Sequence, residues 1–389
     1  MRLLRIVSSM NPSSGGISAG IRGMHQNLKD LNISIKIICF DDPHSPWAND
    51  CDGDIICLGP VNNKYGYKIN LESQIRSIAC NFDVAIIEGI WSYHSFVSWK
   101  VFRSLKIPYV VFTHGMLDPW FKRTYPLKHL KKSIYWPFTD FRVLKDAYAV
   151  LFTTSKEKEL ASKSFRLYKA NELVVGYGTS APPSDVNGQK ELFLNRFPSL
   201  RNKRILLFLS RIHPKKGIDL LIEAFAKIAK KDLSLCLVIA GPDQIGIQSK
   251  LQSQVISAGV DDQVVWTGML DGDYKWGALR CSELFCLPSH QENFGVVVAE
   301  ALACGLPVAI SHEVNIASDV AQYNAGFTFE DTVAGTTLAL DSWLLTPETE
   351  ISNMRCQSIR LFSDMYNFEI VAQNIYNVLS SSIRSSQSH

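Results

Sequence analysis

The sequence predicts an α/β protein built from two Rossmann-like, doubly wound domains that face a cleft. Short apolar runs alternate with amphipathic stretches along most of its 389 residues, a length that suits two domains. The alternation restarts after residues 176–189, "GYGTSAPPSDVNGQ", where glycine, proline and serine indicate a linker. Ligands bind at the carboxyl ends of parallel strands in such folds, so we expect the functional residues there.

Buried parallel strands are predicted in both halves of the chain. In the first half the apolar runs are residues 4–9, 33–40, 82–89, 107–115 and 147–155, with helical patterns between them at 17–31 and 92–105. In the second half they are residues 204–210, 233–241, 263–268, 283–289 and 306–311. This βαβ alternation predicts domains at 1–180 and 186–365. We expect a helix at about 367–383 to pack back on the first domain.

Composition narrows the class of protein. The chain is 46% hydrophobic and 20% charged, and no run reaches the ~18 apolar residues of a membrane span. The N-terminal residues lack the apolar core of a signal peptide. Nine cysteines without a C-x-x-C pair are typical of reduced core residues, so we expect a cytoplasmic protein.

Charge is distributed unevenly along the chain. Residues 1–185 hold 23 Lys+Arg against 16 Asp+Glu, a net +7, whereas residues 186–389 hold 17 against 21, a net −4. The first half is therefore the better candidate to meet an anionic partner. We expect no nucleic-acid partner.

Two predicted strand–loop–helix segments have loops suited to phosphate groups. The loop within 204–225 carries Arg211, Lys215 and Lys216, followed by Gly217 where the helix opens. Cations beside a helix N-terminus favour a phosphate, although a solvated basic loop is the alternative. In the first half, Gly15 and Gly16 would let the backbone approach a ligand before a helix from about residue 17.

A third loop raises the question of a buried carboxylate. In "SHQENFGVVVAEALACGLPVAI" Glu292 lies in a loop, and Glu300 lies in an apolar helix expected from about Phe294 and closed by Gly305 and Pro307. A buried, unpaired charge is costly, so Glu300 needs a partner. A hydroxylated ligand group such as a ribose and a core Arg or Lys both fit, and the spacing leaves both open.

Several motifs together resemble the family 4 retaining glycosyltransferases of GT-B architecture. They are "SRIHPKKG", "LVIAGPD", "VVWTGML" and "PSHQENFGVVVAEALACGLPVAIS", spanning roughly residues 204–320, with a looser match at "SSGGIS" and "THGMLDPW". The stretch "EGIWSYHS…THGMLDPWFKRTYPLKHLKKSIYWPF" is most similar to the bacterial surface-polysaccharide branch. The resemblance implies a nucleotide-sugar donor, with UDP or GDP, and a glycan or lipid-linked glycan acceptor.

The resemblance also implies roles for residues around the donor. Glu300 would bind the ribose hydroxyls, and Glu292 would contact the donor sugar with help from backbone N–H groups. The residues that would offer those groups are Asn293, Phe294 and Gly295. Here Asn293 stands where the family often has proline, and "VVGYGTSAPP" stands where it commonly has Asn-Gly. Both departures bear on the identity of the donor.

Further roles concern the diphosphate, the base and the reacting centre. Arg211 and Lys216 would neutralise the diphosphate, and Gly16 would face the phosphates from the other domain. His114 would lie near the sugar and the reacting centre. The base would lie near Gly241, Pro242 and Met269.

These charges imply a reaction without a metal or a cofactor. Cations and two helix N-termini would stabilise the departing nucleoside diphosphate. The family's same-face attack, with the leaving phosphate taking the acceptor proton, would retain the configuration. The "DGD" sequences at 52–54 and 271–273 are interpreted as turns rather than metal sites.

Two other classes of protein are alternatives to a glycosyltransferase, and a third is disfavoured. A sugar-nucleotide epimerase of GT-B-like fold would need no acceptor, and a non-catalytic nucleotide-sugar-binding protein would not need all the charged groups kept here. A nicotinamide dehydrogenase is disfavoured because no G-x-G-x-x-G follows the first strand. The histidines His25, His94 and His312 are expected to be structural or exposed, with His94 the one to watch.

Residues 121–145 predict an anionic membrane surface as a further partner. They hold seven Lys/Arg and one Asp, interleaved with aromatic and aliphatic residues. Such a segment suits the inner face of the cell membrane, through Lys128, Lys131 and Lys132. A solvated helix whose aromatic side chains face the core is the alternative.

Overall fold

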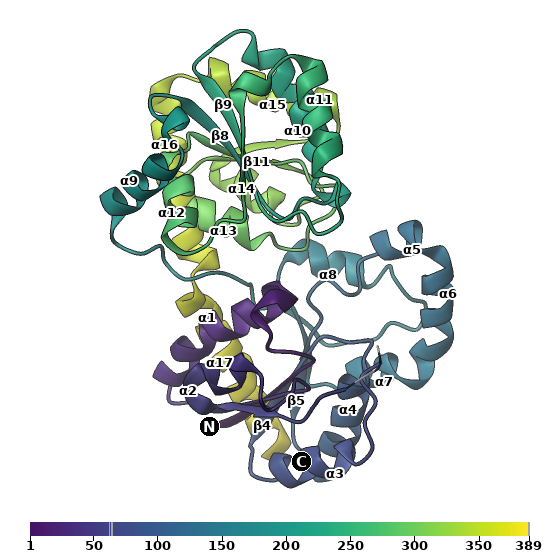
Figure 1. The fold of residues 1–389 in the computed structure, drawn as a ribbon. Coiled ribbons are helices and arrows are strands. Elements are labelled where there is room, and N and C mark those ends of the chain that lie inside the picture. The colour runs from purple at the N-terminus through teal and green to yellow at the C-terminus, as the bar shows by residue number, and fades with distance from the viewer. Residues whose placement is uncertain (62, 64, 388–389) are drawn as a thin grey trace. The chain divides into compact units, whose positions relative to one another are not determined.

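A computed structural model of the chain describes residues 1–61, 63 and 65–387 (Figure 1). The chain forms two compact units. The first holds Met1–Thr179 together with the C-terminal segment from Phe368, and the second holds Ser180–Asn367. The division therefore falls within a few residues of the expected domain limits at 180, 186 and 365.

The amino-terminal unit is built on a seven-stranded parallel sheet of order β3-β2-β1-β4-β5-β6-β7. Its strands are β1 Arg2–Val7, β2 Ser34–Cys39, β3 Ile55–Cys57, β4 Val84–Glu88, β5 Tyr109–Phe112, β6 Ala149–Phe152 and β7 Glu172–Val174. The strand order reverses between β1 and β4. This is the topological switch point, where doubly wound sheets place their ligands.

Nine helices of the described residues belong to this unit. They are α1 Gly16–Asp30, α2 Asp50–Gly53, α3 Leu71–Ala79, α4 Tyr93–Leu105, α5 Trp120–Thr124, α6 Pro126–Tyr135, α7 Asp140–Lys145, α8 Ser155–Ala161 and α17 Phe368–Gln387. The last helix packs beside α1 (Figure 1). A Cβ on Gly23 would lie 2.3 Å from a ring carbon of Phe368, so glycine there makes room for this ring. The C-terminal helix thus completes the amino-terminal unit.

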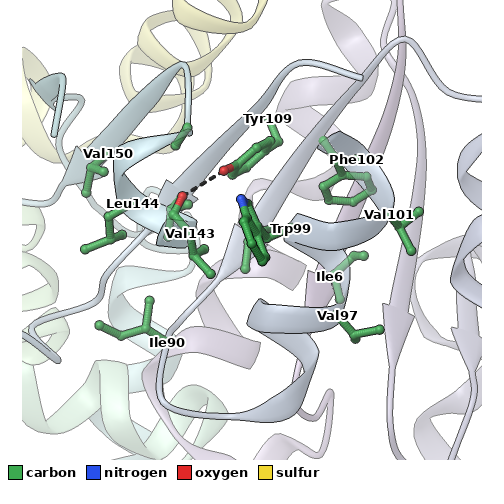
Figure 2. Close-up of a cluster of buried hydrophobic side chains, with 14 of the residues drawn as sticks. Ile6, Ile90, Val97, Trp99, Val101, Phe102, Tyr109, Val143, Leu144 and Val150 are labelled. Carbon is green, nitrogen blue, oxygen red and sulfur yellow. Dashed lines mark hydrogen bonds between the residues drawn. The ribbon is translucent and has the colours of Figure 1, made fainter. Parts of the chain in front are cut away.

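One face of this sheet is closed by a large apolar core (Figure 2). Helix α4 contributes side chains such as Val97 and Phe102, which are fully buried. The Tyr109 hydroxyl donates to the Val143 carbonyl at 2.8 Å, which ties β5 to α7. Burying these side chains fixes the carboxyl ends of β1, β4 and β5 in register.

The carboxyl-terminal unit has a six-stranded parallel sheet of order β10-β9-β8-β11-β12-β13. The strands are β8 Arg204–Leu209, β9 Leu235–Ala240, β10 Val264–Gly268, β11 Leu284–Leu287, β12 Val308–Ser311 and β13 Gly326–Phe329. The helices are α9 Val186–Arg196, α10 Ile218–Ala229, α11 Gln248–Ala258, α12 Gly272–Cys281, α13 Val296–Ala303, α14 Ala317–Tyr323, α15 Val333–Leu345 and α16 Glu348–Leu361. The switch point lies between β8 and β11.

The structure differs from the predicted elements at the sheet edges and at the linker. Strands β3, β7 and β13 were not predicted, and each has only three or four residues at an edge. The predicted linker at 176–189 was too long. Tyr177 is buried within the amino-terminal unit, and α9 already begins at Val186.

Candidate active site

The predicted phosphate loop and the predicted glutamate loop meet at the switch point of the carboxyl-terminal unit. They follow β8 and β11, which are neighbours in the sheet. The His290 N–H donates to the Lys215 carbonyl at 2.8 Å, joining the two loops. A Cβ on Gly217 would lie 2.1 Å from the Pro288 carbonyl oxygen, and Gly217 has φ +65°. Only glycine allows this approach without strain.

The basic loop concentrates positive charge. The Lys215 N–H donates to His213 Nδ1 at 3.1 Å, which opens a short 3₁₀ turn over Pro214–Lys216. Burial and the neighbouring cations lower the pKa of His213. Lys216 is mostly buried and forms an ion pair with Glu292. Arg211 is exposed and has no ion pair among the residues that the structure describes.

The backbone of Glu292 is fixed by a parallel bridge. Its N–H donates to the Glu313 carbonyl, and its own carbonyl accepts from the Asn315 N–H, both at 3.0 Å. The Asn315 side-chain amide also lies 3.4 Å from the Asn293 side-chain oxygen. This anchoring places the Glu292 carboxylate, which is partly exposed, against the basic loop.

The start of α13 differs from the prediction. The helix begins at Val296 rather than about Phe294, with Gly295 in the left-handed region at φ +76° before it. The Phe294 ring is buried and lies edge-on to the Tyr366 ring, with 5.2 Å between the ring centres, so the Phe294 side chain is part of the core. Only backbone groups of Phe294 are therefore placed to meet a ligand.

Glu300 has the partner that its burial requires. Lys275 on α12 donates to Glu300 Oε1 at 2.6 Å, and the Lys275 ammonium also lies 4.5 Å from the Trp276 ring centre. Because α13 starts later than predicted, Glu300 lies about 6 Å along its axis rather than ~9 Å. The core-lysine alternative therefore describes the structure, and ribose binding stays a prediction. Lys275 was not foreseen.

Gly241 and Met269 follow β9 and β10 and lie close together. The Gly241 N–H donates to the Gly268 carbonyl at 2.8 Å, and a Cβ on Gly241 would lie 1.8 Å from the Ser210 carbonyl oxygen. Met269 is 66% exposed. An exposed, flexible apolar side chain beside a glycine turn can pack against a planar ring.

In the amino-terminal unit Gly15 and Gly16 lie at the exposed start of α1. The helix begins at Gly16, and Gly15 has φ +103°. A Cβ on either glycine would meet no atom within 4 Å, so the space in front of them is open. The Tyr177 hydroxyl donates to the Gly16 carbonyl at 2.8 Å and fixes this turn.

His114 belongs to a buried charged cluster that the sequence did not reveal. Its Nε2 lies 2.7 Å from Glu88 Oε2, and Arg5 Nε donates to Glu88 Oε1 at 2.9 Å. Burial alone would raise the pKa of Glu88, but Arg5 and His114 together lower it to about 2. Glu88 stands in the apolar run "DVAIIEG", so the reasoning applied to Glu300 could have found it.

Of the three other histidines named from the sequence, two are buried in the amino-terminal unit and one is exposed. His94 is buried with Nε2 3.1 Å from the Glu88 carbonyl, and burial lowers its pKa to about 4. His25 lies 3.2 Å from Asp54, and His312 is exposed. Its low pKa keeps His94 neutral at pH 7, and its ring packs near Phe40.

The two "DGD" sequences are occupied by protein contacts. Asp52 and Asp54 accept from Lys29 and Lys36 at 2.8 and 2.9 Å. Neither sequence is a simple turn, because α2 ends at Gly53 within the first and α12 begins at Gly272 within the second. Asp273 accepts from the Gln189 side chain at 2.7 Å.

Residues 121–145 form α5, α6 and α7, and α5 and α6 stand out from the sheet (Figure 1). Trp136 is buried, as the core-facing alternative expects, but α6 itself buries no residue. Lys132 turns inward over the Trp91 ring, 4.1 Å from its centre. Within residues 1–61, 63 and 65–387, every helix is too short or too polar to span a bilayer.

Comparison with known proteins assigns the carboxyl-terminal unit to a known domain type. Residues 190–355 match the family "Glycosyl transferases group 1". The D-inositol 3-phosphate glycosyltransferase of Gordonia bronchialis is 29% identical over 199 residues, 46% of this chain and 43% of that protein. The chain thus spans less than half the length of this relative.

Solved structures share the whole fold. Anabaena HepE in complex with UDP and glucose is similar over 98% of this chain and 100% of that one, with a TM-score of 0.75 and 17% identity. Sucrose-phosphate synthase from Thermosynechococcus elongatus is similar over 99% of both chains, with a TM-score of 0.77 and 17% identity. These likenesses confirm the predicted α/β fold with two Rossmann-like units.

Proposed function

We propose that the protein is a retaining glycosyltransferase that moves a sugar from a UDP- or GDP-sugar to a saccharide or lipid-linked saccharide in cell-surface polysaccharide synthesis. One observation carries this proposal. At the switch point of the unit that matches the group 1 transferases, two carboxylates are paired with two lysines beside an exposed Arg211. A nucleoside diphosphate sugar offers the phosphates and hydroxyls that these charged groups bind.

Each charged group has a proposed part in donor binding. Arg211 and Lys216 neutralise the diphosphate. Glu300 accepts hydrogen bonds from the ribose, and Lys275 orients the Glu300 carboxylate. Glu292 accepts from hydroxyls of the donor sugar. Gly241 and Met269 border the base. Both carboxylates are already ion-paired, so the site avoids the cost of burying them alone when no donor is bound.

The chemistry requires stabilised charge on the departing diphosphate. Two cations and the backbone amides before α13 supply this in a preorganised form, without a metal. The acceptor hydroxyl attacks the anomeric carbon on the face that the diphosphate leaves, and a phosphate oxygen takes its proton. From the amino-terminal unit, His114 and Gly16 are proposed to act near the reacting sugar and the phosphates.

Association with an anionic membrane surface is part of this proposal. Four apolar side chains at spacings of three and four residues are between 61% and 82% exposed: Leu127, Leu130, Ile134 and Phe138. This spacing puts them on one face of α6 and the turn after it, beside exposed lysines. Apolar side chains flanked by lysines suit the interface of an anionic bilayer.

A vesicle assay tests the membrane part. Lys128→Glu/Lys131→Glu should co-sediment less with anionic vesicles than the wild type, because each lysine near the surface contributes ~1 kcal/mol. The control is Lys227→Glu/Lys230→Glu, which makes the same charge change on and just after α10. Equal sedimentation of all three proteins would contradict membrane binding through α6.

A product assay tests the activity. The enzyme is incubated with UDP- and GDP-sugars, with and without saccharide acceptors, and products are followed by NMR. We expect release of nucleoside diphosphate and an α-linked product from an α-linked donor. Conversion of the nucleotide sugar into its epimer without an acceptor would favour the epimerase. Donor binding without either reaction would favour a non-catalytic binding protein.

A further inference from the structure

A cavity in the amino-terminal unit, apart from the candidate site described above, has the features of a ligand site. It measures about 570 Å³ and is lined by aromatic and charged side chains from separate parts of the chain. The aromatic residues are Tyr65, Trp91 and Tyr135, and the charged ones are Lys131, Lys132 and Asp140. A cavity of this size, with apolar walls and a few polar groups, is typical of small-molecule sites.

Trp91 is held in an unfavourable backbone conformation at this cavity. It follows β4 by three residues and has φ +73°, which is rare for a bulky side chain. Its N–H donates to Asp140 at 3.1 Å, and its indole N–H donates to the Met116 carbonyl at 3.1 Å. Strain that surrounding bonds maintain is found mainly at functional sites. Glu88 is the last residue of β4, so it lies at the same end of the sheet as Trp91.

Lys132 is a half-buried cation that has no ion pair among the described residues, although Asp140 acts on it electrostatically. Its ammonium lies 4.1 Å from the centre of the Trp91 ring. Asp140, the carboxylate among the lining residues, accepts hydrogen bonds from Trp91 N–H and Ser95 Oγ rather than from Lys132. Burial lowers the pKa of Lys132, Asp140 opposes this effect in part, and the nearby Lys128 lowers the pKa further. Removing a cation from water is costly unless an anion compensates it.

These features suit one class of ligand. The apolar C–H face of a pyranose packs on aromatic rings, and Tyr65 and Tyr135 are exposed enough to offer theirs. Lys132, with Lys131 beside it, would then meet a carboxylate or phosphate on the same sugar. A neutral sugar would leave the Lys132 ammonium without an anion in direct contact.

We propose that this cavity binds an anionic monosaccharide unit of the acceptor, a sugar acid or a sugar phosphate. The acceptor role rests on the proposed function, whereas the binding chemistry does not. Lys132 sets the preference for a charged sugar, and Trp91 sets the orientation of its ring.

Ligand-observed NMR tests this preference. The probes are methyl glucuronide, glucose 6-phosphate and the neutral methyl glucoside, each titrated into the full-length protein. We expect the two anionic probes to bind at least ~10-fold more tightly than the neutral one, the effect of one charge-assisted contact. A preference for only one of the two anions would identify the anion as carboxylate or phosphate.

Variants locate the preference. Lys132→Met should remove it and Lys132→Arg should restore it, while Lys128→Gln on the same helix, outside this cavity, should leave it unchanged. Equal binding of all three probes to the wild type, or an unchanged preference in Lys132→Met, would overturn the proposal. UDP and GDP binding is measured in each variant. A protein that binds neither nucleotide contradicts the proposed function, whereas one that binds nucleotide without discriminating the sugars contradicts only this inference.

Discussion

Each unit has a glutamate at the switch point of its sheet, but the two glutamates differ in burial and in their ion pairs. At the switch point of the amino-terminal unit, Glu88 is fully buried and both of its oxygens are taken by Arg5 and His114. In the carboxyl-terminal unit, Glu292 keeps 20% of its side chain exposed and pairs with a lysine. A fixed buried cluster suits the positioning of a histidine. A single, partly exposed ion pair can rearrange around a ligand.

Removing the buried carboxylate should have the largest effect on stability. Glu88→Ala leaves Arg5 buried without an anion, and breaking a buried pair in this way costs about 3–5 kcal/mol. Glu72→Ala is the control, since Glu72 pairs with Lys100 on the surface and should cost about 1 kcal/mol or less. Urea denaturation measures both. Equal losses would mean that Arg5 and Glu88 are not a buried pair in solution.

The same cluster predicts a dependence of stability on acid. The pKa of Glu88 is lowered from its ordinary 4.5 to about 2 by Arg5 and His114, after burial has opposed them. A carboxyl group whose pKa is lowered by folding stabilises the folded state, and this stabilisation is complete at pH values above the pKa of the group in the unfolded chain. This contribution, about 3 kcal/mol, should be lost as pH falls from about 4.5 to about 2. The free energy of unfolding of Glu88→Gln should fall less steeply across that window than that of the wild type.

Removing a charge from the phosphate loop should lower the affinity for the donor more than it lowers the stability of the fold. Arg211→Ala or Lys216→Ala should reduce nucleoside diphosphate affinity by about 10–150-fold, the worth of one charge-assisted contact. The matched control is Lys203→Ala, because Lys203 lies just before β8, at its opposite end. Calorimetric titration compares the three variants. A loss of affinity in Lys203→Ala as large as in the others would point to a general charge effect.

Substitutions of the two glutamates should affect different parts of donor binding: Glu300 the nucleotide, and Glu292 the sugar. Glu300→Gln should weaken nucleoside diphosphate binding by about 2–10-fold, because a neutral hydrogen bond replaces a charged one. Glu292→Gln should leave the diphosphate nearly unaffected and reduce discrimination between donor sugars. If Glu300→Gln binds nucleoside diphosphate as well as the wild type, the ribose assignment is wrong.

The sequence predicted every strand inside the sheets and the edge strand β10, but it missed the other three edge strands, β3, β7 and β13. Central strands such as β4 and β8 are continuous apolar runs because both of their faces are covered. Strand β7, "ELV", is three residues long and only partly buried, so no apolar run marks it. Alternation of short runs therefore sufficed for the fold class but not for the full width of each sheet.

The sequence predicted the charged residues that stand in motifs of the candidate site, but it did not predict the residues that pair with the glutamates. Arg211, Lys216, Glu292 and Glu300 stand in local patterns that carry their chemistry. Lys275 lies 25 residues before Glu300 on another helix, and Arg5 lies 83 residues before Glu88 on another strand. Pairing of this kind is set by strand order, which the sequence alone did not give.

The most direct test is the binding of UDP and GDP to the wild type in EDTA, compared with Arg211→Ala/Lys216→Ala and Glu88→Gln. The phosphate charge is met by cations and backbone amides, so at least one nucleotide should bind the wild type without a metal. The double variant should lose that binding, and Glu88→Gln, once shown to be folded, should keep it. Binding that appears only with Mg²⁺ or Mn²⁺, or that survives in the double variant, would contradict this account of the site.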